Sequence, residues 1–196
     1  MSIMKKALLL IAVLEVIFCL QIGNVAASES ITIDGTLSLG LDDFGYGDKI
    51  TPGYGVGVNI DMTKYFFRQA KGRKLLFRAD INYYQWRDRI GYLEWSYTRT
   101  PVFLGGRFFS PYWPVFYLEG GLECIFVSTK SNYTGPLFGI NSEGFKTSHR
   151  DFDVGITPGL GIEIPIGDKL VAGMNARAHF TYDFYATIGI SVGYRF

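Results

Sequence analysis

The sequence ends in the stretch ATIGISVGYRF, in which every second residue from Ile188 to the terminal Phe196 is apolar or aromatic. Successive side chains of a β-strand point to opposite faces of a sheet, so this stretch predicts a strand with one apolar and one polar face. Chain ends of soluble domains usually fray into water. The end of this chain is instead expected to be held in a sheet, with one face in an apolar environment.

The same alternation recurs in tracts along the whole chain. Eight tracts cover approximately residues 30–42, 53–62, 75–86, 92–108, 114–127, 152–164, 170–181 and 186–196. The fourth is the least regular, because Pro101 interrupts its ladder. Their lengths are close to the ~9–11 residues that a tilted strand needs to cross a bilayer. The pattern predicts an all-β fold without a second domain.

The N-terminus has the pattern of an export signal. Lys5 and Lys6 precede an apolar run that only Glu15 interrupts, and Val25 and Ala27 stand at the positions expected before a cleavage site. We therefore predict a cleaved signal peptide over 1–27 and a mature domain over 28–196.

Two other interpretations of this segment fit less well. A retained membrane helix would need ~20 apolar residues, and the run here is shorter and contains Glu15. A lipid anchor on Cys19 would need a small residue before it, where Phe18 stands. Cleavage leaves Cys124 as the only cysteine, so the exported domain is expected to fold without an internal disulfide.

Alternation alone also fits a soluble sandwich or a soluble ligand-binding barrel. Three features favour a membrane barrel, whose lipid-facing outside is apolar and whose lumen is polar. Aromatic residues gather near the tract ends, as in NYYQW, SPYWPVFY and YDFY, and charges of both signs share the polar face. Glycines are also frequent on that face, where side chains converge: Gly55, Gly57, Gly121, Gly155, Gly159, Gly161, Gly189 and Gly193. We predict an eight-stranded antiparallel transmembrane β-barrel with up-and-down meander topology.

The inward charges form the main candidate site. Because an unpaired charge in a narrow lumen is costly, acids and bases are expected to pair across the barrel. The predicted lumen charge network contains Arg78, Asp80, Arg99, Arg107, Glu119, Glu123, Glu163 and Arg177. A narrow pore in which these pairs rearrange is the alternative.

Connections between the tracts alternate in character. With both termini in the periplasm, the outside loops fall near 43–52, 87–91, 128–151 and 182–185, and the periplasmic turns near 64–74, 109–113 and 165–169. The 128–151 loop is the longest, and together with 87–91 it is the candidate for binding a surface ligand. The turn KYFFRQAKGRK carries five cations that are expected to be solvated or to touch anionic headgroups: Lys64, Arg68, Lys71, Arg73 and Lys74.

These residues resemble the small eight-stranded outer-membrane β-barrel proteins of Gram-negative bacteria, the porin-like or outer-membrane protein X-like group. The resemblance lies in the C-terminal pattern and in SYTRTPVFLGGRFF followed by PVFYLEGGLE. It implies a location in the bacterial outer membrane, contact with lipid and lipopolysaccharide, and no cofactor. It also implies that the barrel-assembly machinery recognises an assembly signal formed by Ile188, Ile190, Val192, Tyr194 and Phe196.

Enzymatic interpretations are weaker. Lipid A deacylases of similar size carry a His-x-Ser pair and a later Glu, whereas this chain has His179 and Thr181 with no Glu after them. The segment SHRDFD supplies the residue types of a Ser/His/Asp triad, Ser148, His149, Asp151 and Asp153, but within one polar loop. The two histidines do not have the spacing of a metal site.

Charge excludes one further class of function. Lys and Arg number 19 against 18 Asp and Glu, without a basic block, so the sequence does not predict nucleic-acid binding. The sequence therefore predicts a non-enzymatic barrel with a structural or surface-interaction role. A pore is the first alternative and a deacylase-like enzyme the second.

Overall fold

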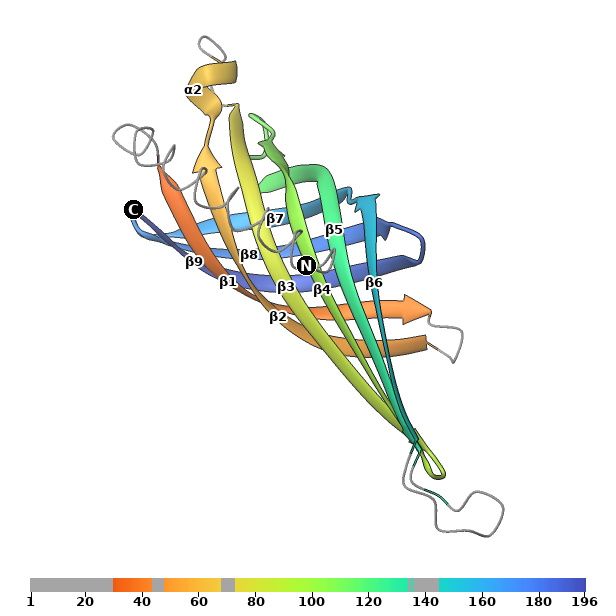
Figure 1. Ribbon diagram of the computed structural model, residues 1–196. Coiled ribbons are helices and arrows are strands. Elements are labelled where there is room, and N and C mark those ends of the chain that lie inside the picture. Colours follow the sequence, from red (N-terminus) through yellow and green to blue (C-terminus); the bar gives the residue numbers. More distant parts are fainter. Residues whose placement is uncertain (1–29, 44–47, 68–72, 134, 136–144) are drawn as a thin grey trace.

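The structure is a computed structural model that describes residues 30–43, 48–67, 73–133, 135 and 145–196 (Figure 1). The predicted signal peptide, 1–27, lies outside these residues. The described elements are β1 (Ile31–Asp43), β2 (Asp48–Asp61), α2 (Thr63–Phe66), β3 (Lys74–Ile90), β4 (Leu93–Phe109), β5 (Phe116–Tyr133), β6 (Phe145–Ile156), β7 (Gly159–Ile166), β8 (Leu170–Phe180) and β9 (Phe184–Arg195). No helix within these ranges is long and apolar enough to cross a membrane.

The strands form a closed antiparallel ring. Apart from β6 and β7, which both pair with β5 and β8, strands next to each other in sequence pair with each other. The ring closes where β1 pairs with β9, from Thr32↔Arg195 to Asp42↔Tyr185. Closure leaves the wall of the barrel without an edge, as a sheet in lipid requires. The predicted meander barrel is confirmed.

The sixth predicted tract is divided into β6 and β7 but remains one line of the wall. Leu122↔Ile156 and Glu119↔Gly159 lie in the same register on β5, so no residue is inserted between the two strands. The ladder is interrupted at Thr157 and Pro158, and Pro158 has no N–H to donate. Nine strands therefore build an eight-membered wall in the described part of the chain.

The two faces of the wall are inverted relative to a soluble protein. Leu37 and Val192 point outward with 64% and 63% of their surface exposed, whereas the inward Arg78 is 2% exposed. Polar residues thus form most of the buried interior and apolar residues cover the outside, as the alternation predicts. Ile60 departs from the pattern, because it is buried although its position in β2 points outward.

Four strands, β3 to β6, continue as a separate sheet after their pairing with the neighbouring strands has ended. Pairing between β2 and β3 begins at Gly53↔Tyr84, yet β3 continues to Ile90. At the other side β8 reaches β6 only through Ile156↔Phe180, although β6 begins at Phe145. We call the four-stranded sheet formed by 85–98, 128–133 and 145–152 the extension; Figure 1 shows it as a narrow projection away from the C-terminus.

The extension corrects the predicted 128–151 loop. Residues 128–133 and 145–150 are paired strand, from Ser128↔Arg150 to Tyr133↔Phe145. Their sequence lacks apolar alternation because both faces of the sheet project beyond the apolar band, so composition alone resembles a loop. The predicted 87–91 loop is also wrong, since β3 and β4 pair up to Ile90↔Leu93 and leave Gly91 and Tyr92 as the turn.

Other connections differ by a few residues. Strands β1 and β2 reach Asp43 and Asp48, so the predicted 43–52 loop is also too long. The 64–74 turn contains the unpredicted helix α2. Gly167 lies in the β7–β8 turn with a φ of 66°, a backbone conformation that glycine adopts without strain.

A pair of inward glycines lets β4 and β5 approach closely. Gly105 lies directly opposite Gly121, and a Cβ on Gly121 would lie 2.5 Å from Gly105 Cα. A Cβ on Gly105 would lie 2.5 Å from Phe103 Cζ, and Phe103 is fully buried. Gly105 therefore makes room for the Phe103 ring, and Gly121 makes room for the backbone of β4.

This geometry predicts opposite outcomes for two adjacent glycines. The Gly121→Val variant should lower the free energy of unfolding by about 1–3 kcal/mol, since its side chain collides with backbone atoms. Gly120→Val should be neutral or slightly stabilising, because a Cβ at the outward Gly120 meets nothing within 4 Å. Urea unfolding in detergent micelles measures both values, and equal losses in the two variants would contradict the proposed crowding.

Candidate functional site

The lumen contains a chain of ion pairs that begins at β1. Arg78 Nη1 lies 2.6 Å from Asp34 Oδ2 and its Nη2 lies 2.9 Å from Asp34 Oδ1, so the contact is bidentate. Arg78 Nε also lies 2.6 Å from Asp80 Oδ2. Asn59 Nδ2 donates to Asp34 Oδ2 at 2.8 Å. One guanidinium thus holds two carboxylates that come from different strands.

Arg177 of β8 connects this group to the far side of the lumen. Its Nη2 lies 2.7 Å from Asp80 Oδ2, and its Nε lies 2.7 Å from Glu119 Oε1. The guanidinium carbon also lies 4.4 Å from the centroid of the Phe103 ring. Arg177 therefore bridges β3, β5 and β8 across the barrel.

The last members of this series of ion pairs lie toward the end of the barrel that carries the C-terminus. Arg107 Nε donates to Glu119 Oε2 at 2.9 Å, and Arg107 Nη1 lies 3.5 Å from Glu163 Oε2. Lys74 Nζ lies 3.3 Å from Glu163 Oε1 and is the most exposed member. Arg107 also stacks over Tyr117, 4.4 Å from its centroid.

Four acids and four bases therefore alternate without interruption. We call the set the ion-pair chain; in order, it is Asp34, Arg78, Asp80, Arg177, Glu119, Arg107, Glu163 and Lys74. Burying charges is tolerable only when each is paired and its remaining hydrogen-bonding groups are satisfied. Each member has at least one partner of opposite charge, so every charge in the chain is paired, and the set fills the lumen with side chains.

Six of the eight predicted network residues lie in the ion-pair chain, and sequence reasoning missed Asp34 and Lys74. Asp34 stands on the polar face of the first tract, so the alternation of the strand could have placed it in the predicted network. Lys74 was assigned to the basic turn, because the sequence does not show that β3 begins there. Arg99 and Glu123, the other two predicted members, lie in a separate cluster.

This second cluster surrounds Glu123, which is 1% exposed. Its Oε2 lies 2.7 Å from His179 Nδ1 and accepts a hydrogen bond from Tyr185 Oη at 3.0 Å. The His179 and Tyr185 rings stack with centroids 4.0 Å apart, and Arg99 lies 4.1 Å from the Tyr185 centroid. Arg99 thus occupies the lumen beside an aromatic ring.

The cluster also contains an arrangement that resembles a hydrolase triad. His179 Nε2 lies 2.9 Å from Thr187 Oγ1, and its Nδ1 faces Glu123. A hydroxyl, an imidazole and a carboxylate are therefore connected in that order by hydrogen bonds, as in a hydrolase triad. His179 and Thr187 are only 2% and 6% exposed. A nucleophile must reach its substrate, and here the hydroxyl is enclosed by the packed lumen. The arrangement therefore links β5, β8 and β9 as a structural hydrogen-bond network.

The residues considered for catalysis in the sequence do not assemble. Thr181 Oγ1 donates to the carbonyl of Asp183 and lies outside the cluster of His179. His149 Nε2 lies 2.8 Å from Asp151 Oδ2 on β6, but Ser148 projects from the opposite face of that strand. Asp153 Oδ2 instead accepts the N–H of Tyr182.

The predicted basic turn and the potential metal ligands add no further site within the described ranges. Among the described residues, no three His, Cys, Asp or Glu side chains are grouped so that they could hold a metal ion. Of the predicted basic turn, Lys74 belongs to the ion-pair chain, and Arg73 lies 5.8 Å from the centroid of Phe67. Lys64 is exposed, and Arg68 and Lys71 fall outside the described residues.

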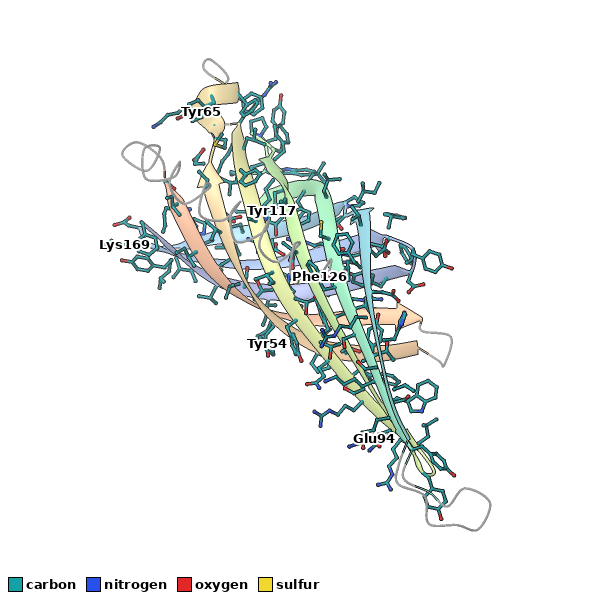
Figure 2. All side chains as sticks on the ribbon, viewed as in Figure 1. Tyr54, Tyr65, Glu94, Tyr117, Phe126 and Lys169 are labelled. Carbon is teal, nitrogen blue, oxygen red and sulfur yellow. The ribbon has the colours of Figure 1, made fainter. Side chains whose placement is uncertain are left out.

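The extension offers a second kind of site. It has two open edges, one along 85–90 of β3 and one along 145–152 of β6, because β2 and β8 do not pair there. Its outward-facing side forms a groove of about 770 Å³ between β3, β4, β5 and β6. Figure 2 places Glu94, which lines this groove, far from Lys169 and Tyr65 at the other end of the molecule.

Comparisons with known proteins agree with the geometry. A family model described as "Outer membrane protein beta-barrel domain" matches residues 12–196. The attachment invasion locus protein Ail of Yersinia pestis is similar, with a TM-score of 0.55, 16% identity, and coverage of 86% of this chain and 97% of Ail. A major outer membrane protein from Thermus thermophilus has a TM-score of 0.54 at 10% identity, covering 86% of this chain and 100% of that one.

Ail was also solved in complex with the heparin analogue sucrose octasulfate, and that structure has a TM-score of 0.52 at 16% identity, covering 86% of this chain and 97% of that chain. At these identities the structural likenesses show the fold alone. No curated protein matches the sequence.

The ion-pair chain predicts unequal costs for removing its members. The Arg177→Met variant should lose about 3–5 kcal/mol of unfolding free energy, because Asp80 and Glu119 would stay buried without their shared partner. Lys74→Met, at the partly exposed end, should lose no more than about 1 kcal/mol. Urea unfolding in micelles gives both values, and a small loss for Arg177→Met would show that the chain is not a structural element.

Proposed function

The chain belongs to the outer membrane protein β-barrel domain family and lies in the bacterial outer membrane, and from this premise we propose that it is a closed barrel that acts through its extension. The observation that carries the proposal is that β3, β4, β5 and β6 continue together as a separate four-stranded sheet after their pairing with β2 and β8 has ended. A barrel needed only as a membrane element would not require paired strands beyond the lipid. The extension is therefore the part that meets other molecules.

The packed lumen supports a non-conducting barrel. Eight strands leave an interior that side chains can just fill. Arg177, Phe103 and the carboxylates beside them cross the middle of that space, and all of them are buried. Opening a pore would require several ion pairs to separate together, which makes the pore the second candidate.

The site geometry also supports a role without catalysis. The one hydroxyl–imidazole–carboxylate arrangement described here, at Thr187, His179 and Glu123, is enclosed in the lumen. A deacylase would need such groups where an acyl chain can reach them. We therefore propose that the protein is not an enzyme.

The projecting strands support an orientation. Outer-membrane barrels keep short connections on the periplasmic side and project longer segments outside. Since the extension projects at the end opposite the C-terminus, this supports placing both termini in the periplasm and the extension at the cell surface. The proposed assembly signal then lies on the outward face of β9, where Ile188, Ile190 and Val192 are exposed for recognition by the assembly machinery. The complex of Ail with a heparin analogue supports testing anionic ligands at the extension.

Planar-bilayer recording tests whether the barrel is closed. The refolded protein should produce no steady conductance above that of protein-free detergent, since ion pairs and aromatic rings fill its lumen. A reproducible unitary conductance would overturn this part of the proposal and favour the pore.

Labelling of single cysteines tests the orientation. In a Cys124→Ser background, Glu94→Cys should react with a membrane-impermeant maleimide on intact cells, because Glu94 lies in the extension. Asp168→Cys, in the β7–β8 turn at the other end, is the matched control and should react only after the outer membrane is permeabilised. The reverse pattern would place the extension in the periplasm and exclude a role at the cell surface.

A further inference from the structure

The outward face of β3 to β6 changes abruptly from apolar to polar. Val102, Cys124 and Val154 form one cross-strand row on this face, and Thr100, Phe126 and Phe152 form the next. The Phe126 and Phe152 rings contact each other with centroids 5.2 Å apart. Figure 2 shows Phe126 near the middle of β5, where the strand passes from the barrel toward the extension. Aromatic residues of this kind mark the boundary of the hydrocarbon layer.

Three polar rows follow immediately on the same face. Directly paired residues of neighbouring strands share a face, so the registers give each row without ambiguity. The rows are Gln85, Thr98, Ser128 and Arg150; then Arg87, Ser96, Lys130 and Ser148; then Arg89, Glu94, Asn132 and Lys146. No aliphatic or aromatic side chain interrupts these rows.

The groove on this face is positively charged. Its charged lining residues are Arg87, Lys130 and Lys146 against the single carboxylate of Glu94, and all four are exposed. Serine and threonine hydroxyls lie between the cations along the lining of the groove. Guanidinium, ammonium and hydroxyl groups together are the donors that bind phosphate oxygens.

The height of the groove matches the headgroup layer. A step of two residues rises about 5 Å along the membrane normal for a strand tilted by ~40°. The three polar rows therefore lie within about 15 Å of the aromatic boundary. Phosphate groups of membrane lipids occupy this zone, directly above the acyl chains.

We propose that this face is a binding surface for the phosphates of lipopolysaccharide in the outer leaflet. The inference rests on the proposed orientation, which puts the extension on the side of that leaflet. Continuity with the lipid-facing surface favours this partner over a soluble polyanion, because a lipid whose acyl chains contact Phe126 and Phe152 brings its phosphates to the groove. Arg87, Lys130 and Lys146 bind the phosphates, and the hydroxyls bind neighbouring phosphate or sugar oxygens.

Titration with bis-phosphorylated lipid A tests this assignment. The full-length mature protein is refolded in non-ionic micelles, and bound lipid A is counted by native mass spectrometry. The triple variant Arg87→Gln, Lys130→Gln and Lys146→Gln should bind lipid A about a hundred-fold more weakly, since each cation near a phosphate layer contributes roughly a factor of five. All three side chains are exposed, so the barrel should keep its heat-dependent electrophoretic mobility.

A variant of equal charge change is the control. Lys64→Gln, Arg73→Gln and Lys169→Gln remove three exposed cations from the other end of the barrel and should leave lipid A affinity within a factor of about three. Dephosphorylated lipid A with the same acyl chains should bind the unmodified protein and the groove variant alike. Equal losses in both triple variants, or equal affinity for the two lipids, would overturn the inference.

A further arm separates a soluble ligand from the lipid. If the groove variant loses affinity for sucrose octasulfate but keeps its affinity for lipid A, the surface binds a soluble polyanion and the inference is wrong. Failure of the proposed function is recognised separately, because it would appear as a conducting barrel or as cysteine labelling from the periplasm.

Discussion

The pairing of β1 with β9 is the interaction on which the rest of the structure depends. Lipid offers no partner for backbone N–H and C=O groups, so strands can cross a bilayer only when the sheet has no open edge. The ladder from Thr32↔Arg195 to Asp42↔Tyr185 satisfies this condition, and it brings the last residues of the chain against the first described strand. An exposed aromatic side chain at Phe196 is then part of a membrane surface rather than of a frayed tail.

Closure decides what the interior must be. The apolar side chains face lipid, so the narrow lumen receives the polar half of every strand and has to neutralise it without bulk water. The ion-pair chain from Asp34 to Lys74 does so by alternating charge, and aromatic rings such as Phe103 fill the space that the charged groups leave. The inward Gly105 accommodates the Phe103 ring, and Gly121 opposite it lets β4 and β5 approach closely. The result is a packed interior made mostly of polar groups.

The same constraint is released where the strands leave the lipid. Residues 85–98, 128–133 and 145–152 remain paired although two edges of their sheet are open, because water can satisfy the edge groups there. The outward face can then be polar. The apolar residues of 85–98, such as Trp86, Trp95 and Tyr97, lie on the opposite face, and 128–133 and 145–150 have no apolar period-2 pattern. Sequence reasoning consequently identified the eight membrane-crossing segments and assigned a loop to 128–151, where the structure has strands β5 and β6 around a shorter connection. The cationic groove belongs to this segment, and its residues look scattered in sequence.

The sequence by itself determined the eight membrane-crossing segments, the side that each faces and the inverted polarity of the barrel, because alternation is a local property of consecutive residues. Because side chains alternate between the two faces of a strand, the sequence also placed six charged residues in the lumen: Arg78, Asp80, Arg107, Glu119, Glu163 and Arg177. Only the tertiary structure decided which charges pair, because partners such as Asp80 and Arg177 lie 97 residues apart and meet through closure of the ring. For the same reason it alone separated Glu123 and Arg99 into the cluster around His179, and aligned Arg87, Lys130 and Lys146 on one face. These neighbour relations depend on how the strands are aligned with one another, and no single stretch of sequence specifies that alignment.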